Sequence, residues 1–270
     1  MNLIKKFFKN KKGSGLVEKI MITAFAVAAG GAVIVYTSNV VIEAKNHNVP
    51  GLSLTEGGTA GMIPESSGTD GLIYTLNGNT YSVTGYEGSA TNVVIPSTYN
   101  GKNVTDIGNS AFENNRNITS VNIGYNVTRI GEQTFRLCSA MTSVSIPSSV
   151  TVLSRSAFAS SGLVSVTIPD SVTSVENYAF NGCKSLQSIT FGEGVTTIGG
   201  WVCEFNSALR TVNLGGHVTS IGQRAFLSCG ITSFTFNNTV SAWNSVSKGS
   251  NYAYNNSFTY VQCTDGNGSK

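Results

Sequence analysis

The stretch Ile107-Gly-Asn-Ser-Ala-Phe112 opens a unit that the chain repeats five more times. It returns as IGEQTF from Ile130, LSRSAF from Leu153, VENYAF from Val175, IGGWVC from Ile198 and IGQRAF from Ile221. Successive units begin 22 or 23 residues apart. A fixed period of this size is typical of a solenoid, in which each unit forms one turn of a coil. Residues 107–236 are therefore predicted to be six stacked turns.

Each unit also carries a strand signal. An apolar residue opens an L-x-x-V-x-I pattern, whose alternation with period two indicates a strand with one buried face. A Gly or Pro usually ends this strand, and a shorter alternating stretch leads into the next unit. The opening residues are Ile118, Met141, Leu163, Leu186, Leu209 and Ile231.

No unit can bury its apolar face alone, so stacking must place like residues on like. One expected ladder runs through the last position of the opening hexapeptide: Phe112, Phe135, Phe158, Phe180, Cys203 and Phe226. The fold class predicted from these patterns is a mainly β, leucine-rich-repeat solenoid with a cap at each end.

The units I-G-x-x-A-F-x-x-C-x-x-L-x-x-V-x-I-P-x-x-V-T resemble BspA-like leucine-rich repeats, which are found on bacterial surface proteins. The resemblance covers roughly residues 72–265. The chain departs from the pattern at Cys203, which replaces the Phe, and at Ser154 and Glu176, which replace the Gly. The resemblance implies a cell-surface binding or adhesion role and supplies no catalytic residues.

The charge balance argues against nucleic acid as a partner. The formal net charge is +3, but five of the 17 basic residues lie in the first 13 positions, which contain no acid. The remainder is slightly acidic, so no basic stripe is left to track a phosphate backbone.

The five cysteines do not suggest disulfides or a metal site. Cys138, Cys183 and Cys229 share one position of the repeat, and cysteines two turns apart would lie ~10 Å apart at the strand spacing, too far to bridge. They are predicted to be small buried residues of a ladder. The sequence contains no Cys-x-x-Cys, so no metal or other cofactor is expected.

The N-terminal part is predicted to deliver and anchor the repeats. Residues 1–13 form a basic leader, and residues 20–42 are free of charge. We therefore expect a long apolar helix over 14–43 that crosses a membrane, with the N-terminus in the cytoplasm and the repeats outside. The plain interpretation is an uncleaved signal anchor, and a cleaved secretory signal is a further alternative.

The same segment resembles a type IV pilin leader of the Flp-type subgroup. The leader ends in Gly13, and Glu18 is the fifth residue of a chain that would start at Ser14. The resemblance implies cleavage after Gly13 by prepilin peptidase and a role for Glu18 in assembly with other pilin subunits. Lys19 and Ser14 depart from the residues common in that subgroup. A pseudopilin of a secretion system is a third interpretation.

The remaining segments are assigned by composition. Residues 44–70 are rich in Gly, Ser and Thr and read as a flexible linker. Residues 71–106 are predicted to cap the solenoid, with a hairpin turning at Asn77-Gly78. Residues 237–270 are predicted to be the C-terminal cap and tail, with Trp243 in the core.

Two surfaces are candidates for binding. The outer face of the main strands carries ladders of small polar residues, and solenoids often bind on such extended faces. Tyr178 and Trp201 occupy the same outward position in adjacent units, with Phe205 nearby, and clustered exposed aromatic residues are favoured contact anchors. Local packing around Cys203 is the competing explanation.

No constellation in the sequence points to an enzyme. The chain has only two histidines, His47 and His217, and its acidic residues are scattered singly at turns. We expect an adhesion or binding protein of the bacterial cell surface that displays its solenoid on a pilin-like filament subunit, with a membrane-anchored binding protein that does not polymerise as the alternative. The expected partner is a host or bacterial surface protein or a glycan.

Overall fold

The computed structural model describes residues 24–29, 32–37 and 68–270. The chain divides into two compact units, Met1–Pro64 and Glu65–Lys270. The described part of the first unit is a pair of antiparallel strands, β1 (Ala24–Ala29) and β2 (Ala32–Thr37).

The prediction of a helix over 14–43 is wrong for these described residues, because they form strands. An apolar run that is rich in β-branched residues does not distinguish a buried helix from a strand by its pattern alone. Val33, Ile34 and Val35 favour the extended form, and Gly30-Gly31 between the two stretches is a hairpin dipeptide. Among the described residues, no helix is both long and apolar enough to span a membrane. Gly13, Ser14, Glu18 and most of the predicted linker lie outside the described residues.

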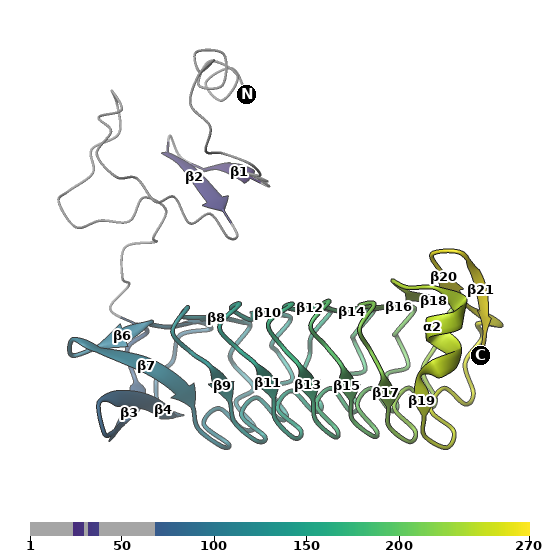
Figure 1. Ribbon diagram of the computed structural model, residues 1–270. Helices are drawn as coiled ribbons and strands as arrows, with labels where there is room; N and C mark the ends of the chain where they lie inside the picture. Colours follow the sequence, from purple (N-terminus) through teal and green to yellow (C-terminus); the bar gives the residue numbers. More distant parts are fainter. Residues whose placement is uncertain (1–23, 30–31, 38–67) are drawn as a thin grey trace, which may run out of the picture. The chain divides into compact units, whose positions relative to one another are not determined.

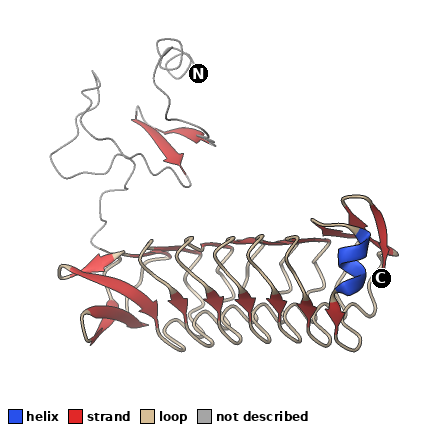
Figure 2. Ribbon diagram, in the orientation of Figure 1, coloured by secondary structure: helices blue, strands red, loops and turns tan. Residues whose placement is uncertain are grey.

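The second unit is a row of stacked turns, as the repeat predicts (Figure 1). Each repeat contributes a main strand and a short strand, and Figure 2 shows that loops join them. The main strands are β5 (Asn92–Ile95), β8 (Ser120–Ile123), β10 (Ser143–Ser145), β12 (Ser165–Ile168), β14 (Ser188–Phe191), β16 (Thr211–Leu214) and β18 (Ser233–Phe236). The short strands are β9 (Arg129–Ile130), β11 (Val152–Leu153), β13 (Ser174–Val175), β15 (Thr197–Ile198), β17 (Ser220–Ile221) and β19 (Ser247–Lys248).

The short strands form one continuous parallel sheet with β7 (Lys102–Ile107), whereas the main strands form two sheets. One contains β5, β8 and β10, and the other runs from β12 to β21 (Gly266–Ser269). The strand registers place Ser188 beside Thr211 and Ile189 beside Val212, so equivalent residues of successive repeats lie side by side. The predicted mainly β solenoid is confirmed.

The interval between the two main-strand sheets coincides with a repeat that is 22 residues long. Its turn is one residue shorter after Phe158, and Gly162 directly precedes the opening Leu163. A Cβ atom at Gly162 would lie 2.2 Å from the carbonyl oxygen of Ser139 in the previous turn. Glycine is therefore what allows the shortened turn to stack. A backbone hydrogen bond from Val164 N to Thr142 O, 3.2 Å long, connects the two turns there.

The core is built from ladders, as predicted. The rings of Phe112, Phe135, Phe158 and Phe180 stack at centroid distances of 5.1, 5.4 and 5.3 Å. The ladder stops at Cys203. Phe191 of β14 then contacts Phe226 edge to face at 6.2 Å, so a large residue on the strand accompanies the small residue in the ladder.

The N-terminal cap is made of hairpins. β3 (Leu72–Asn77) and β4 (Thr80–Tyr86) pair antiparallel across the predicted Gly78 turn. A second hairpin joins β6 (Thr98–Tyr99) to β7 (Lys102–Ile107) through Asn100-Gly101, where both residues have positive φ. That Asn-Gly signal for a tight hairpin was present in the sequence but was not used. Thr69 N donates to Val94 O, so ordered cap contacts begin before residue 71.

The C-terminal cap contains the short helix α2 (Val240–Ser245), which the sequence analysis did not anticipate. Thr239 caps it by accepting a hydrogen bond from Ala242 N, an arrangement typical of helix starts. Trp243 is fully buried, as predicted, and its Nε1 donates to Ser269 O. The tail pairs as β20 (Tyr260–Cys263) and β21 (Gly266–Ser269) and extends the sheet.

Replacing Gly162 by Ala should destabilise the solenoid by about 1–3 kcal/mol, because the new methyl group has to displace the backbone of the neighbouring turn. Gly230→Ala is the matched control, since Gly230 ends the other shortened turn. There the nearest atoms to an added Cβ belong to the Arg210 guanidinium, the end of a flexible side chain, and the nearest backbone atom is Ser207 O at 2.9 Å, farther than the 2.2 Å contact at Gly162. Urea midpoints of the two variants should differ accordingly. Equal midpoints would show that the Gly162 contact is absorbed without cost.

Candidate functional site

The loop that follows each short strand, which we call the outer loop, has an unusual backbone. In every repeat two positions four residues apart have positive φ. The first is filled by Ser110, Gln133, Ser156, Tyr178, Trp201 and Arg224, and the second by Asn114, Leu137, Ser160, Gly182, Phe205 and Ser228. Residues other than Gly, Asn and Asp rarely adopt this conformation. Backbone bonds to the next turn hold it here, for example Phe180 N to Val202 O at 2.8 Å.

The structure brings Tyr178 and Trp201 together at the first of these positions. Their rings are stacked, with centroids 5.0 Å apart and an interplanar angle of 6°. The guanidinium carbon of Arg155 lies 5.5 Å from the centroid of the Tyr178 ring. A cation near an aromatic face is attracted by the ring quadrupole. Arg155 is a member of the cluster that the sequence analysis missed.

Phe205 lies at the second positive-φ position of the turn that carries Trp201, and 51% of its surface is exposed. Within the described residues its ring contacts neither Tyr178 nor Trp201. The three predicted site residues therefore comprise a stacked pair and a separate exposed aromatic residue on the same turn as Trp201.

The polar atoms of the stacked pair have no internal partner. Neither the Tyr178 hydroxyl nor the Trp201 indole N–H forms a hydrogen bond within the part of the chain that the structure describes. Both rings are half-buried. The pair thus offers a hydroxyl and an N–H donor on adjacent turns.

Arg224 follows Trp201 at the same repeat position and contacts a buried acid. Its Nη2 lies 2.8 Å from Glu204 Oε1. Glu204 Oε1 accepts no hydrogen bond of good geometry. The contact is therefore an ion pair in which the N–H groups of Arg224 do not point at this oxygen. The other carboxylate oxygen accepts from Asn181 Nδ2 at 3.3 Å. These contacts hold Glu204 within the turn and leave it unavailable as a free surface charge.

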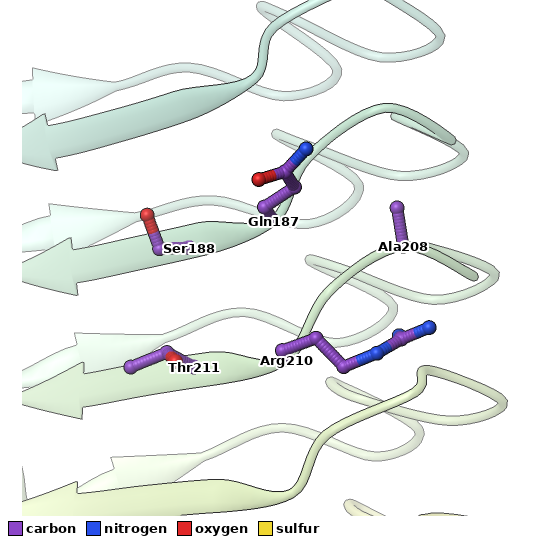
Figure 3. Close-up of a pocket in the computed structure, with 5 residues that line it drawn as sticks. All are labelled: Gln187, Ser188, Ala208, Arg210 and Thr211. Carbon is purple, nitrogen blue, oxygen red and sulfur yellow. The ribbon is translucent and has the colours of Figure 1, made fainter.

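A shallow groove of about 470 Å³ lies on the same two repeats (Figure 3). Gln187 and Ser188 line it from one turn, and Ala208, Arg210 and Thr211 line it from the next. In Figure 3 the Arg210 side chain extends away from the strand and along its own turn. Its Nη1 donates to Ser207 O at 2.8 Å and to Leu209 O at 3.2 Å, which fixes the direction of the guanidinium.

The predicted polar ladders differ in how well their side chains are satisfied. In the ladder that contains Thr190, Asn213 and Thr235, the Asn213 amide donates to Thr190 Oγ1 at 3.2 Å and accepts from the Thr235 hydroxyl at 2.8 Å. In the ladder that contains Ser188 and Thr211, the hydroxyls of these two residues have no hydrogen-bond partner among the described residues, and they border the groove. The hydroxyls of Ser143, Ser165 and Ser233 in the same ladder are likewise without a partner there.

The position shared by three cysteines is a hydrogen-bond donor position, which the sequence analysis did not recognise. Cys138, Cys183 and Cys229 each donate to the carbonyl three residues before the equivalent position of the preceding turn, at 3.1, 3.1 and 3.0 Å. Asn206 does the same with its amide, to Phe180 O at 3.1 Å. This explains why Cys, Ser and Asn share the position, since each can donate to a buried carbonyl.

All five cysteines are buried and free, and burial was predicted for Cys138, Cys183 and Cys229. Burial raises the pKa of the Cys138 and Cys229 thiols to about 12 and that of Cys183 to about 11. The thiols are therefore protonated in the folded chain. Among the described residues, no group of three or more His, Cys, Asp or Glu side chains is placed to hold a metal ion.

Comparison with known families decides the assignment of the repeats. The BspA type Leucine rich repeat region matches residues 86–186 and 138–261, in six copies. The chain belongs to this BspA-type leucine-rich repeat family. The loops, ladders and groove described above are therefore features of BspA-type turns.

Two solved structures are similar to this BspA-type chain. A leucine rich cell surface protein from Faecalibacterium prausnitzii is 27% identical with a TM-score of 0.59, and the match covers 73% of this chain and 54% of that one. This chain thus spans about half of that protein's length. The T. pallidum Leucine Rich Repeat protein is 21% identical with a TM-score of 0.57, covering 66% of this chain and 83% of that one. That second likeness shows the fold alone. No curated protein matches the chain.

The buried thiols predict a loss of stability at alkaline pH. The pKa of Cys138 rises from 9.0 to about 12 on folding. The unfolded chain therefore releases these protons first, so stability is complete below pH about 9 and falls as pH rises towards 12. A variant with Cys138→Ser, Cys183→Ser and Cys229→Ser replaces each thiol by a small hydroxyl donor, the group that Ser161 places at this position of the native chain.

Urea midpoints of the native chain and this triple variant, measured at neutral pH and at pH about 10.5, should test the effect. The native chain should lose more stability over this interval than the variant. An equal loss in both would contradict the assignment of the effect to the thiols.

Proposed function

We propose that the protein is a binding protein of the bacterial cell surface, whose solenoid holds its partner on the repeats that carry Tyr178, Trp201 and Phe205. The observation that carries the proposal is the stacked aromatic pair with its unpaired polar atoms. The Faecalibacterium prausnitzii relative is described as a cell surface protein, and this supports the location. The partner class is a surface protein or a glycan of a host or another bacterium.

Packing around Cys203 explains the aromatic pair less well. Phe191 and Phe226 meet edge to face on the core side of that repeat, whereas Tyr178 and Trp201 lie on the outer loop with part of each ring exposed. Other repeats place Ser, Gln or Arg at the same position and retain the same backbone. The fold therefore does not require aromatic residues there, and half-exposed aromatic side chains are typical of contact surfaces.

The double variant Tyr178→Ala, Trp201→Ala should abolish binding of the full chain while the chain stays folded. Loss of the stack should cost only about 0.5–1.5 kcal/mol of stability. The readout is retention on an array of immobilised glycans and extracellular proteins, with thermal unfolding as the check of folding. Gln133→Ala is the matched control, because Gln133 occupies the same positive-φ position in another repeat. A folded double variant with native retention would place binding on another face.

A filament subunit is a narrower candidate for the same surface role. The basic leader, Gly13, Ser14 and Glu18 support it by their resemblance to a pilin leader. The pairing of β1 with β2 speaks against the apolar helix that such a subunit would pack into a filament. A membrane-tethered protein that does not polymerise does not require cleavage after Gly13. A pseudopilin of a secretion system, the third candidate, shares the pilin-like leader with the filament subunit.

Intact mass of the protein from native membranes and from sheared surface material should separate these candidates. A chain that starts at Ser14 in the sheared fraction is the expected result for a filament subunit cut by prepilin peptidase. A chain that still starts at Met1 and is confined to membranes would rule out the filament and leave the tethered binding protein.

A further inference from the structure

We propose that the groove on the two repeats that carry the aromatic pair binds an acidic saccharide, with Arg210 as the residue that receives its anionic group. This rests on the proposed binding function and specifies the chemistry of the ligand. The groove is formed by Gln187, Ser188, Ala208, Arg210 and Thr211. It belongs to the same two repeats as Tyr178 and Trp201.

Few acids lie near the groove in the sequence. Residues 159–169, 181–192, 205–218 and 227–238 contain no Asp or Glu, although Asp170, Glu193 and Glu204 directly border them. Glu204 is buried against Arg224, and Glu193 accepts from Gly216 N and Asn237 Nδ2. Lys184 and Arg210 are the cationic residues in these stretches, and both are exposed. Neither forms an ion pair within the described residues. Such a site favours an anion, because its cations are not already neutralised.

Arg210 is held with its recognition edge free. Two carbonyl oxygens accept from Nη1, whereas Nε and Nη2 have no partner among the described residues. That edge of a guanidinium binds a carboxylate or a sulfate through two parallel hydrogen bonds.

Gly230 in the next turn makes room for this arrangement. A Cβ atom at Gly230 would lie 1.8 Å from Nη1 of Arg210 and 2.7 Å from its Cζ. The guanidinium therefore occupies the space of a missing side chain. Glycine is the residue that allows Arg210 to lie along the turn.

The remaining groups of the groove suit a saccharide better than a peptide. The Gln187 amide and the hydroxyls of Ser188 and Thr211 are without partners in the described part of the chain, and they can exchange hydrogen bonds with sugar hydroxyls. Ala208 is the one apolar residue of the lining. The main-strand backbone is already paired between β14 and β16, so a peptide cannot add to it as a further strand.

Lys184 extends the cationic surface into the preceding turn. Lys184 lies two residues before Leu186, and Ser207 lies two residues before Leu209, so the two residues occupy equivalent positions in successive repeats. Since the Ser207 carbonyl anchors Arg210, the two cations follow one another along the solenoid. A saccharide with anionic groups on successive residues would meet both.

The test uses the full chain with three tetrasaccharides, measured by calorimetry: tetragalacturonate, a heparin tetrasaccharide and maltotetraose. The native chain should bind one or both acidic sugars and prefer them to the neutral one, and salt should weaken the binding. Binding of tetragalacturonate would show that a carboxylate is sufficient, whereas binding of the heparin tetrasaccharide alone would show that a sulfate is needed, since heparin carries both groups. The basic leader is present in every variant, so differences between variants isolate the groove.

Arg210→Gln should weaken binding of the acidic sugar about tenfold or more, the scale of a lost hydrogen-bonded charge contact. Gly230→Ala should weaken it too, because it moves the guanidinium without removing the charge. Arg116→Gln is the matched control, since Arg116 occupies the position of Lys184 in a distant repeat, and it should bind as the native chain does.

The proposal is overturned if the native chain shows no preference for an acidic sugar, if Arg210→Gln binds like the native chain, or if Arg116→Gln weakens binding equally. These results can be told apart from failure of the proposed function. If the Tyr178→Ala, Trp201→Ala variant loses retention on the array while Arg210→Gln binds acidic sugars like the native chain, the proposed binding function stands and the acidic-saccharide site is rejected.

Discussion

The backbone hydrogen bonds between consecutive turns are the interaction on which the solenoid depends. They require each residue to lie beside its equivalent in the next repeat, in the two strand ladders and in the outer loops alike. Phe180 N reaches Val202 O and Trp201 N reaches Gln223 O by the same displacement along the chain. Because the match must recur in every repeat, a change of one residue in length has to be absorbed locally. Gly162 and Gly230 do this where the unit shortens to 22 residues.

The same requirement explains which polar groups the core contains. In several turns the outer loop presents a carbonyl to the interior, and a Cys or Asn of the next turn donates to it. Cys183 and Asn206 do so with different chemistry at equivalent positions. A thiol there is a neutral donor whose raised pKa follows from burial, so its presence reflects the backbone and not redox or metal chemistry.

The repeats leave the surface free to differ from turn to turn. Positions that carry Ser or Gln in some repeats carry Tyr178 and Trp201 in others, and the position of Thr119 is taken by Arg210. The backbone is the same in each case, which is why these residues stand out as candidates for recognition. Their coincidence on two adjacent repeats is the main argument that this part of the solenoid contacts a partner.

The sequence by itself determined the period, the family, the buried ladders and the placement of Tyr178 and Trp201 at the same position of adjacent turns, because a repeat places equivalent residues in neighbouring turns. It did not determine the N-terminal apolar run, since helix and strand share its composition, and strands β1 and β2 replaced the expected helix there. It also missed Arg155, the donor role of Cys138 and the groove at Arg210. Those depend on where side chains from different turns and loops come to lie in three dimensions, and only the tertiary structure decides that.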